Sequence, residues 1–169
     1  IVSFTGSAST AKTIYENCAK LFKPCHLEGG GSDTMVISNK TDINFATKAA
    51  ITSSFHLSGQ ICTSTEHLLI HENIYEKFKN LFVKKMSELR VGDGLAKNEI
   101  GPVANSKTFN KANNIISDAL KHGANVIYHK DHKVIMRKKG YFIPPTLIEN
   151  INSKMICSKE EIFAPIVTI

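Results

Sequence analysis

The first 37 residues carry three short apolar runs, separated by a segment of helical period and by a cluster of glycines. The run 1–5 ends in a Gly-Ser pair, and residues 10–22 then place apolar side chains at helical spacing until Pro24 stops the pattern. A short strand and a second apolar strand follow, on either side of the three consecutive glycines 29–31. A strand, a Gly-Ser turn, a helix and another strand predict a βαβ unit with a parallel sheet.

The remainder of the chain alternates in the same way. Residues 42–57 predict a helix for which Asp42 is a good N-cap, and residues 73–89 give the clearest amphipathic pattern. A third helix is expected from about Ser106 to His122, with Gly123 at its C-cap. The strand-like runs are 66–72, 125–129, 133–138 and 141–149, the last of them interrupted by Pro144 and Pro145. The predicted fold class is therefore α/β, a mainly parallel sheet with flanking helices.

Composition narrows the function classes. The chain has 169 residues, 42% of them hydrophobic, which suffices for one ordinary domain with a core. The net charge of +6 comes from scattered lysines without interleaved aromatic residues, so we expect a solvated basic surface and no nucleic-acid partner. No apolar run approaches the roughly 20 residues that cross a bilayer, and the N-terminus does not resemble a signal peptide. Both ends stop inside strand-like runs, so we expect a fold truncated at both ends.

The four cysteines and seven histidines show no zinc-site spacing, and we expect no metal. An even number of cysteines permits disulfides, but free thiols in a reducing compartment, the cytoplasm, are the favoured interpretation.

Two segments near the N-terminus carry candidate chemistry. Gly6 and Ser7 in "FTGS" lie where a strand ends and a helix begins, so backbone N–H groups there can receive a phosphate. An ordinary strand-to-helix turn is the alternative. Glu28 in "LEGGGSD" precedes three glycines that let the backbone approach a ligand, and its carboxylate can act as a base. A surface glutamate before a flexible loop is the alternative there.

Two further segments lie later in the chain. Cys62 in "SGQICTS" sits among small polar residues, a setting that suits a nucleophilic thiol with donors for a developing oxyanion, although a partly buried structural thiol is the alternative. Glu161 and Phe163 in "KEEIFAPIV" put a carboxylate beside an aromatic ring, a pair that can hold a ribose hydroxyl and flank a flat ring. A solvated acidic turn is the alternative.

Taken in order and spacing, "FTGS", "LEGGGSD", "GQICTS" and "EEIFAPI" resemble the motifs of the aldehyde dehydrogenase superfamily. The connecting segments "IHENIYEKF", "VGDGLAKNEIGPV" and "GYFIPPTLIENI" are similar to family segments too, so the resemblance covers essentially the whole chain. It implies an oxidoreductase that converts a small aldehyde to a carboxylic acid with NAD or NADP.

The resemblance also implies roles for single residues. Cys62 would attack the aldehyde carbonyl to give a thiohemiacetal and then a thioester, and Glu28 would activate the water that hydrolyses it. Gly6 and Ser7 would lie near the cofactor pyrophosphate, and Gly30 would also be a cofactor-binding residue. Glu161 would bind the ribose on the nicotinamide side, with Phe163 beside the nicotinamide.

The sequence departs from the family pattern at several positions. Gly29 stands where leucine is usual, which loosens the backbone beside Glu28, and Ala164 replaces the glycine of the usual motif. The chain is also much shorter than family members. By the correspondence, residues 1–37 are the C-terminal part of a Rossmann-like cofactor-binding domain and residues 38–169 an incomplete catalytic domain. We therefore expect the isolated chain to be inactive.

Two alternative functions remain open at this stage. A coenzyme A-acylating aldehyde dehydrogenase would pass the thioester to coenzyme A, although such relatives generally lack the glutamate base. A non-catalytic, truncated binding module is the second alternative. The resemblance further implies a homodimer or homotetramer without a membrane partner, and "GGSD" resembles members that act on lactaldehyde, glyceraldehyde or succinate semialdehyde.

Overall fold

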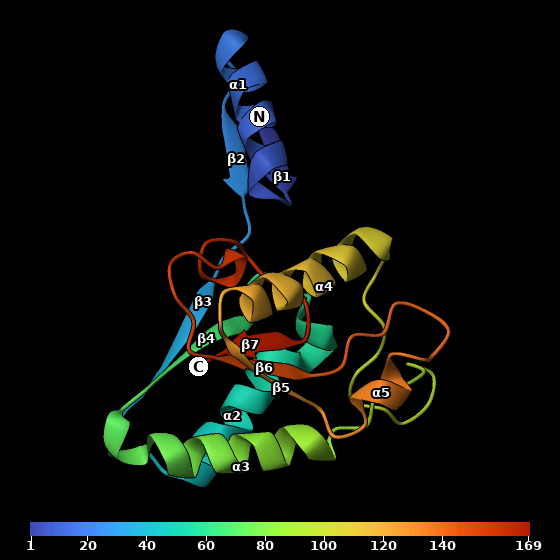
Figure 1. Cartoon of the computed structure of the whole chain (residues 1–169). Coiled ribbons are helices and arrows are strands. Elements are labelled where there is room, and N and C mark those ends of the chain that lie inside the picture. Colours follow the sequence, from blue (N-terminus) through green and yellow to red (C-terminus); the bar gives the residue numbers. More distant parts are fainter. The chain divides into compact units, whose positions relative to one another are not determined.

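The computed structural model describes all 169 residues as two compact units, Ile1–Gly31 and Ser32–Ile169 (Figure 1). In the first unit, strand β1 (Val2–Thr5) leads into helix α1 (Ala8–Lys20) and returns as strand β2 (Cys25–Glu28). The strands β1 and β2 pair in parallel, with Thr5 opposite Glu28. The predicted βαβ unit is confirmed, and its α1 helix begins at the Gly-Ser turn because the Ser7 hydroxyl accepts a hydrogen bond from the Thr10 amide.

The second unit is built on a five-stranded sheet in the order β3-β4-β7-β6-β5. Its strands are β3 (Asp33–Ile37), β4 (Thr65–Ile70), β5 (Asn125–Tyr128), β6 (Thr146–Glu149) and β7 (Ile166–Thr168). All neighbouring pairs are parallel except β5 and β6, which are antiparallel. The sheet is therefore mainly parallel, as the alternating pattern predicted.

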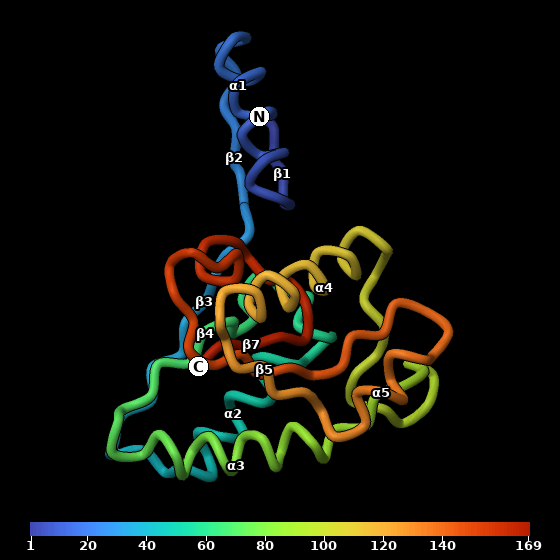
Figure 2. Tube along the Cα trace, viewed as in Figure 1, coloured from blue at the N-terminus to red at the C-terminus, as the bar shows by residue number.

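Helices cover both faces of this sheet, as Figures 1 and 2 show. Helices α2 (Ile43–Phe55) and α3 (Tyr75–Glu88) lie on one face, and α4 (Ser106–Lys121) lies on the other. The central strands contribute side chains to the core on both faces of the sheet, because neighbouring residues of a strand point to opposite faces. Thus Leu147 belongs to the core cluster of α2 and α3, whereas Ile148 belongs to the cluster of α4.

The helix ends follow from single residues. Asp42 accepts a hydrogen bond from the Phe45 amide at 2.8 Å, which confirms it as the N-cap of α2. Gly123 follows α4 with φ +86°, a left-handed conformation that glycine adopts without steric cost. The α2 helix ends at Phe55, earlier than the expected residue 57, because Leu57 and Ser58 are themselves left-handed.

Two strand predictions need correction. The run 133–138 is not a strand: His132–Ile135 forms the short helix α5, in which the Val134 and Ile135 amides donate to the Asp131 carbonyl. Within 141–149, pairing begins only at Thr146, because Pro144 and Pro145 have no N–H to donate to a ladder.

The strand β3, which we assigned to the first domain, pairs with β4 in the sheet of the second unit. The compact units divide at residues 31 and 32, and the domain boundary at 37 stays a prediction. None of the helices combines the length and the apolar character needed to cross a bilayer.

The core of the second unit provides a matched stability test. Phe82 is fully buried in α3 against Phe55 and Phe78, whereas Phe45 in α2 is 72% exposed. We expect Phe82→Ala to lower the free energy of unfolding by about 3–5 kcal/mol, since it leaves a cavity. Phe45→Ala should cost much less. Urea denaturation followed by circular dichroism measures both, and equal losses would contradict this description of the core.

Candidate functional site

The first unit gathers three of the predicted residues at one edge. The Gly6 amide donates to the Glu28 carbonyl at 3.0 Å, so the carboxyl ends of β1 and β2 lie side by side. Ser7 caps α1 at the same edge. The positive end of the helix dipole therefore adjoins the backbone of the predicted base, an arrangement suited to an anionic ligand.

Glu28 is exposed, and its carboxylate oxygen Oε1 lies 2.9 Å from His26 Nε2. Gly30 is also exposed, two residues beyond the end of β2. A Cβ added at Gly29 would meet no atom within 4 Å, so local packing does not require glycine at this departure from the family pattern.

Cys62 belongs to the second unit and lies in a tight turn between α2 and β4. The Ser64 amide donates to the Ile61 carbonyl at 2.9 Å, and the Ser64 hydroxyl donates to the Ser53 carbonyl of α2, also at 2.9 Å. These bonds fix the turn, while Cys62 itself is exposed. The alternative of a partly buried structural thiol is therefore wrong, and the accessibility that a nucleophile needs is present.

The residues before Cys62 form a left-handed run. Leu57, Ser58 and Gly59 have φ values of 49°, 59° and 68°. A non-glycine residue in this region costs about 1–3 kcal/mol, and such residues persist only where surrounding contacts hold them. The Ser58 hydroxyl donates to the Gly101 carbonyl at 3.0 Å, and Gln60 Oε1 accepts from the Ala104 amide at 2.8 Å.

Gly59 is the point at which this run meets the segment that carries Glu161 and Phe163. A Cβ built on Gly59 would lie 2.2 Å from the Ala164 carbonyl oxygen and 3.1 Å from the Ser54 carbonyl oxygen. Only glycine fits this approach. The structure thereby brings the segment of Cys62 together with the predicted cofactor segment, whereas Gly6, Ser7, Glu28 and Gly30 belong to the other unit.

The segment 160–164 is held by two side chains that the sequence reasoning missed. Glu66 Oε1 accepts from the Ile162 amide at 2.7 Å and from the Phe163 amide at 2.9 Å. Lys111 Nζ donates to the Glu161 carbonyl at 2.5 Å. No local motif marks either residue, because both bonds join distant parts of the chain.

Phe163 also borders a pocket of about 550 Å³. Its other walls come from the left-handed run and from the loop after α3, and they include His56, Leu57, Gln60, Asn98 and Pro102. This mixture of an aromatic ring, an amide and an imidazole is typical of a site for a small ligand with both polar and apolar parts.

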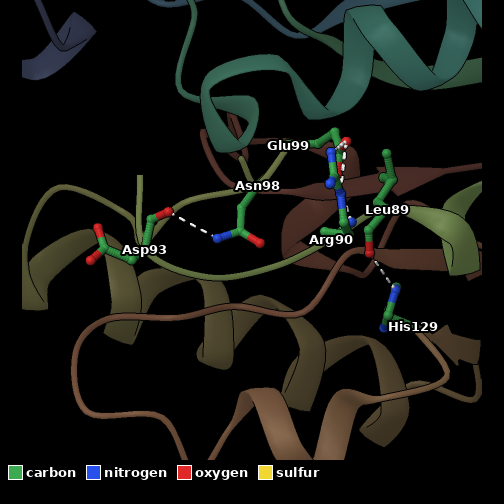
Figure 3. A network of polar contacts seen from close by, with 6 residues as sticks. All are labelled: Leu89, Arg90, Asp93, Asn98, Glu99 and His129. Atoms are coloured by element: carbon green, nitrogen blue, oxygen red, sulfur yellow. Dashed lines mark hydrogen bonds and ion pairs between the residues drawn. The ribbon is translucent and has the colours of Figure 1, made fainter. Parts of the chain in front are cut away.

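The loop that forms the far wall of this pocket is tied down by polar contacts (Figure 3). The Arg90 guanidinium forms several hydrogen bonds to the Glu99 carboxylate, and they lower the pKa of Glu99 to about 2. Asn98 Nδ2 donates to the Asp93 carbonyl at 2.9 Å, and His129 Nε2 donates to the Leu89 carbonyl at 2.9 Å. Because Glu99 is paired with Arg90, the pocket gains little net charge from it.

A second series of hydrogen bonds holds Ser32, the residue that follows the three glycines. Ser32 Oγ bonds to His67 Nε2 at 2.8 Å, and His67 Nδ1 bonds to Thr168 Oγ1 at 2.6 Å. Burial lowers the pKa of His67, because desolvation disfavours the charged ring. The start of β3 is thus linked to β4 and β7. No group of three or more His, Cys, Asp and Glu side chains is placed to hold a metal ion.

The exposure of Cys62 leads to a chemical test. All four cysteines are free, but Cys18 and Cys157 are buried, and burial together with Asp118 raises the pKa of the Cys157 thiol. We expect iodoacetamide to alkylate Cys62 at least about tenfold faster than Cys18 or Cys157, as peptide mass spectrometry measures. In urea the difference should disappear. Equal rates in the folded chain would contradict the placement of Cys62.

Comparison with known proteins shows the family of the chain. The aldehyde dehydrogenase family model matches residues 1–169. Aminoaldehyde dehydrogenase 2, peroxisomal, from Pisum sativum is 34% identical over 169 residues, which cover 99% of this chain and 33% of that protein. The mitochondrial succinate-semialdehyde dehydrogenase of Oryza sativa subsp. japonica is 34% identical over 167 residues, 98% of this chain and 31% of that protein.

Solved structures show the same fold. Betaine aldehyde dehydrogenase from Staphylococcus aureus, in complex with NAD+, superimposes with a TM-score of 0.92 at 31% identity, over 99% of this chain and 34% of that one. The chain spans about a third of the length of the relatives it matches. Its α/β fold and its family match lead to one conclusion: the chain belongs to the aldehyde dehydrogenase family.

Proposed function

We propose that the full-length protein oxidises a small aldehyde to the carboxylic acid with NAD+, through a covalent intermediate on Cys62. The observation that carries this proposal is the exposed Cys62 thiol in a turn fixed by hydrogen bonds. The segment of this turn contacts the segment of Glu161 and Phe163 at Gly59. Membership of the family and a relative solved with NAD+ support it.

Each unit carries residues suited to one part of a dinucleotide. In the proposal, Gly6, Ser7 and the N-terminus of α1 hold the pyrophosphate, because they present backbone N–H groups and a helix dipole at an exposed edge. Gly30 also contacts the cofactor. Glu161 binds the ribose, and the half-buried Phe163 ring packs on the nicotinamide. When bound, the nicotinamide supplies the acceptor for a hydride.

The chain's own residues account for the remaining steps. Cys62 Sγ, as the thiolate, adds to the aldehyde carbon and forms a thiohemiacetal. The oxygen of this adduct needs hydrogen-bond donors, for which the backbone amide of Cys62 in its fixed turn is proposed. After the adduct loses a hydride, a thioester remains on Cys62. Glu28 takes a proton from water, the water attacks the thioester carbon, and the acid and the free thiol leave.

We extend the proposal to substrate, partners and location. The aminoaldehyde and semialdehyde relatives favour a small aldehyde with a polar end, which the polar side chains in the mixed lining of the pocket, such as Gln60 and Asn98, can contact. Assembly as a homodimer or homotetramer is proposed from the family resemblance. The four free cysteines support a reducing compartment, and the cytoplasm is the location proposed.

The test uses the full-length protein with NAD+ and succinate semialdehyde or an aminoaldehyde. We expect Cys62→Ser to reduce NADH formation by about 10³-fold or more, since the nucleophile is lost. Cys25→Ser, the matched control, should leave the rate nearly unchanged. In Glu28→Gln an acyl group should accumulate on Cys62, visible as a mass increase of its peptide.

Three outcomes would contradict the proposal. Activity in Cys62→Ser would exclude the covalent intermediate. Turnover that requires coenzyme A, with acyl-coenzyme A as the product, would establish the acylating alternative. The absence of NADH formation with every aldehyde, together with intact folding, would favour a binding module.

A further inference from the structure

We propose that Glu66 is a positioning residue whose buried carboxylate holds the turn 160–164 in the conformation that presents Glu161 and Phe163 to the cofactor. The inference rests on the proposed function for its consequence in catalysis. Its structural half, that Glu66 fixes this turn, stands on contacts within the second unit alone.

Two backbone amides of the turn form a small anion-binding site, and the Glu66 carboxylate occupies it. The amides of the consecutive residues Ile162 and Phe163 point at the same oxygen, Glu66 Oε1, at 2.7 and 2.9 Å. Successive N–H groups of this kind make a concavity that binds anions, and hydrogen bonds to a charged acceptor are the strong ones. Glu66 enters this concavity from β4, a strand distant in sequence from the turn.

The turn needs such a partner because its backbone is strained. Phe163 has φ +54°, a left-handed conformation that a bulky side chain rarely adopts. On the other side of the turn, Lys111 Nζ donates to the Glu161 carbonyl. Glu66 and Lys111 thus hold the two peptide groups that lie between Glu161 and Phe163.

Burial of the Glu66 carboxylate costs folding free energy, so stability alone does not explain this residue. The residue is only 4% exposed, and its second oxygen, Oε2, is buried without a hydrogen-bond partner. Desolvation raises the pKa of Glu66, partly opposed by the two amide bonds and by Lys111, whereas Glu161 raises it further. An apolar side chain in this place would avoid that cost, so the carboxylate is explained by the geometry it imposes.

Glu66 lies close in sequence to the proposed nucleophile. Glu66 lies four positions after Cys62, where the thiol-bearing turn enters β4. The short segment 62–66 therefore contains the proposed nucleophile and also forms the hydrogen bonds to the turn 160–164. Movement of either turn relative to the other would require these two bonds to break.

The experiment compares Glu66→Ala, Glu66→Gln and Glu149→Gln in the full-length protein. Glu149 is the matched control: it is 6% exposed in β6 and accepts a hydrogen bond from Tyr75 Oη at 2.9 Å, but it forms no hydrogen bond or ion pair with the turn. Two properties are measured. The first is the hydrogen-exchange rate of the Ile162 and Phe163 amides, and the second is the KM for NAD+, which is compared with the change in kcat.

We expect Glu66→Ala to speed exchange of both amides by about tenfold or more and to raise the KM for NAD+ by a similar factor. Glu66→Gln keeps an acceptor oxygen and should restore most of both properties. Glu149→Gln should lower the thermal midpoint without changing either quantity. Unchanged amide exchange in Glu66→Ala, or equal effects in the Glu149 control, would overturn the proposal.

A pH titration of the unmodified protein covers the case in which Glu66→Ala fails to fold. The amide NMR signals of Ile162 and Phe163 should move together at a midpoint above that of an ordinary glutamate, because the Glu66 pKa is raised. The nearby charges are Glu161 and Lys111. The titration should vanish in Glu66→Gln, and its persistence there would overturn the proposal. If Cys62→Ser remained active, the proposed function would fail while these amide measurements still decided the role of Glu66.

Discussion

The contact between Gly59 and the Ala164 carbonyl is the constraint on which the rest of the candidate site depends. No side chain fits at Gly59, and the two turns that meet there both contain left-handed, non-glycine residues. Such strain persists where many contacts over-determine the backbone. Here the contacts come from Ser58, Gln60, Ser64 and Glu66, and together they hold the segment that contains the exposed cysteine against the turn that carries an aromatic ring and a carboxylate.

The sheet explains why these two turns meet. Strands β4 and β7 are parallel neighbours at the centre of the second unit, so the segments that lead into them lie at the same edge. Cys62 precedes β4, and Phe163 precedes β7. The helices on both faces bury the central strands and leave this edge to the turns. A rigid core thus supports two irregular segments, an arrangement typical of sites that bind and react.

The sequence alone predicted much of the fold, whereas the roles of the site residues that it named stay predictions. The N-cap at Asp42 and the left-handed glycine that follows α4, Gly123, are local features, so local patterns sufficed to find them. The run 133–138 was predicted wrongly because an apolar run becomes a strand only where a partner strand exists. Glu66 and Lys111 could not be found, since their partners lie 96 and 50 positions away and only the folded chain brings them together.

The most direct test of this account concerns Gly59 and uses Gly94, which lines the pocket bordered by Phe163, as the control. A Cβ at Gly94 would meet nothing within 4 Å, whereas one at Gly59 would collide with the Ala164 carbonyl. The measurement is the backbone amide chemical shift of Cys62 and of Phe163 in Gly59→Ala and in Gly94→Ala. The account predicts that both signals move in Gly59→Ala and stay in Gly94→Ala. Unchanged signals in Gly59→Ala would show that the two turns do not depend on this contact.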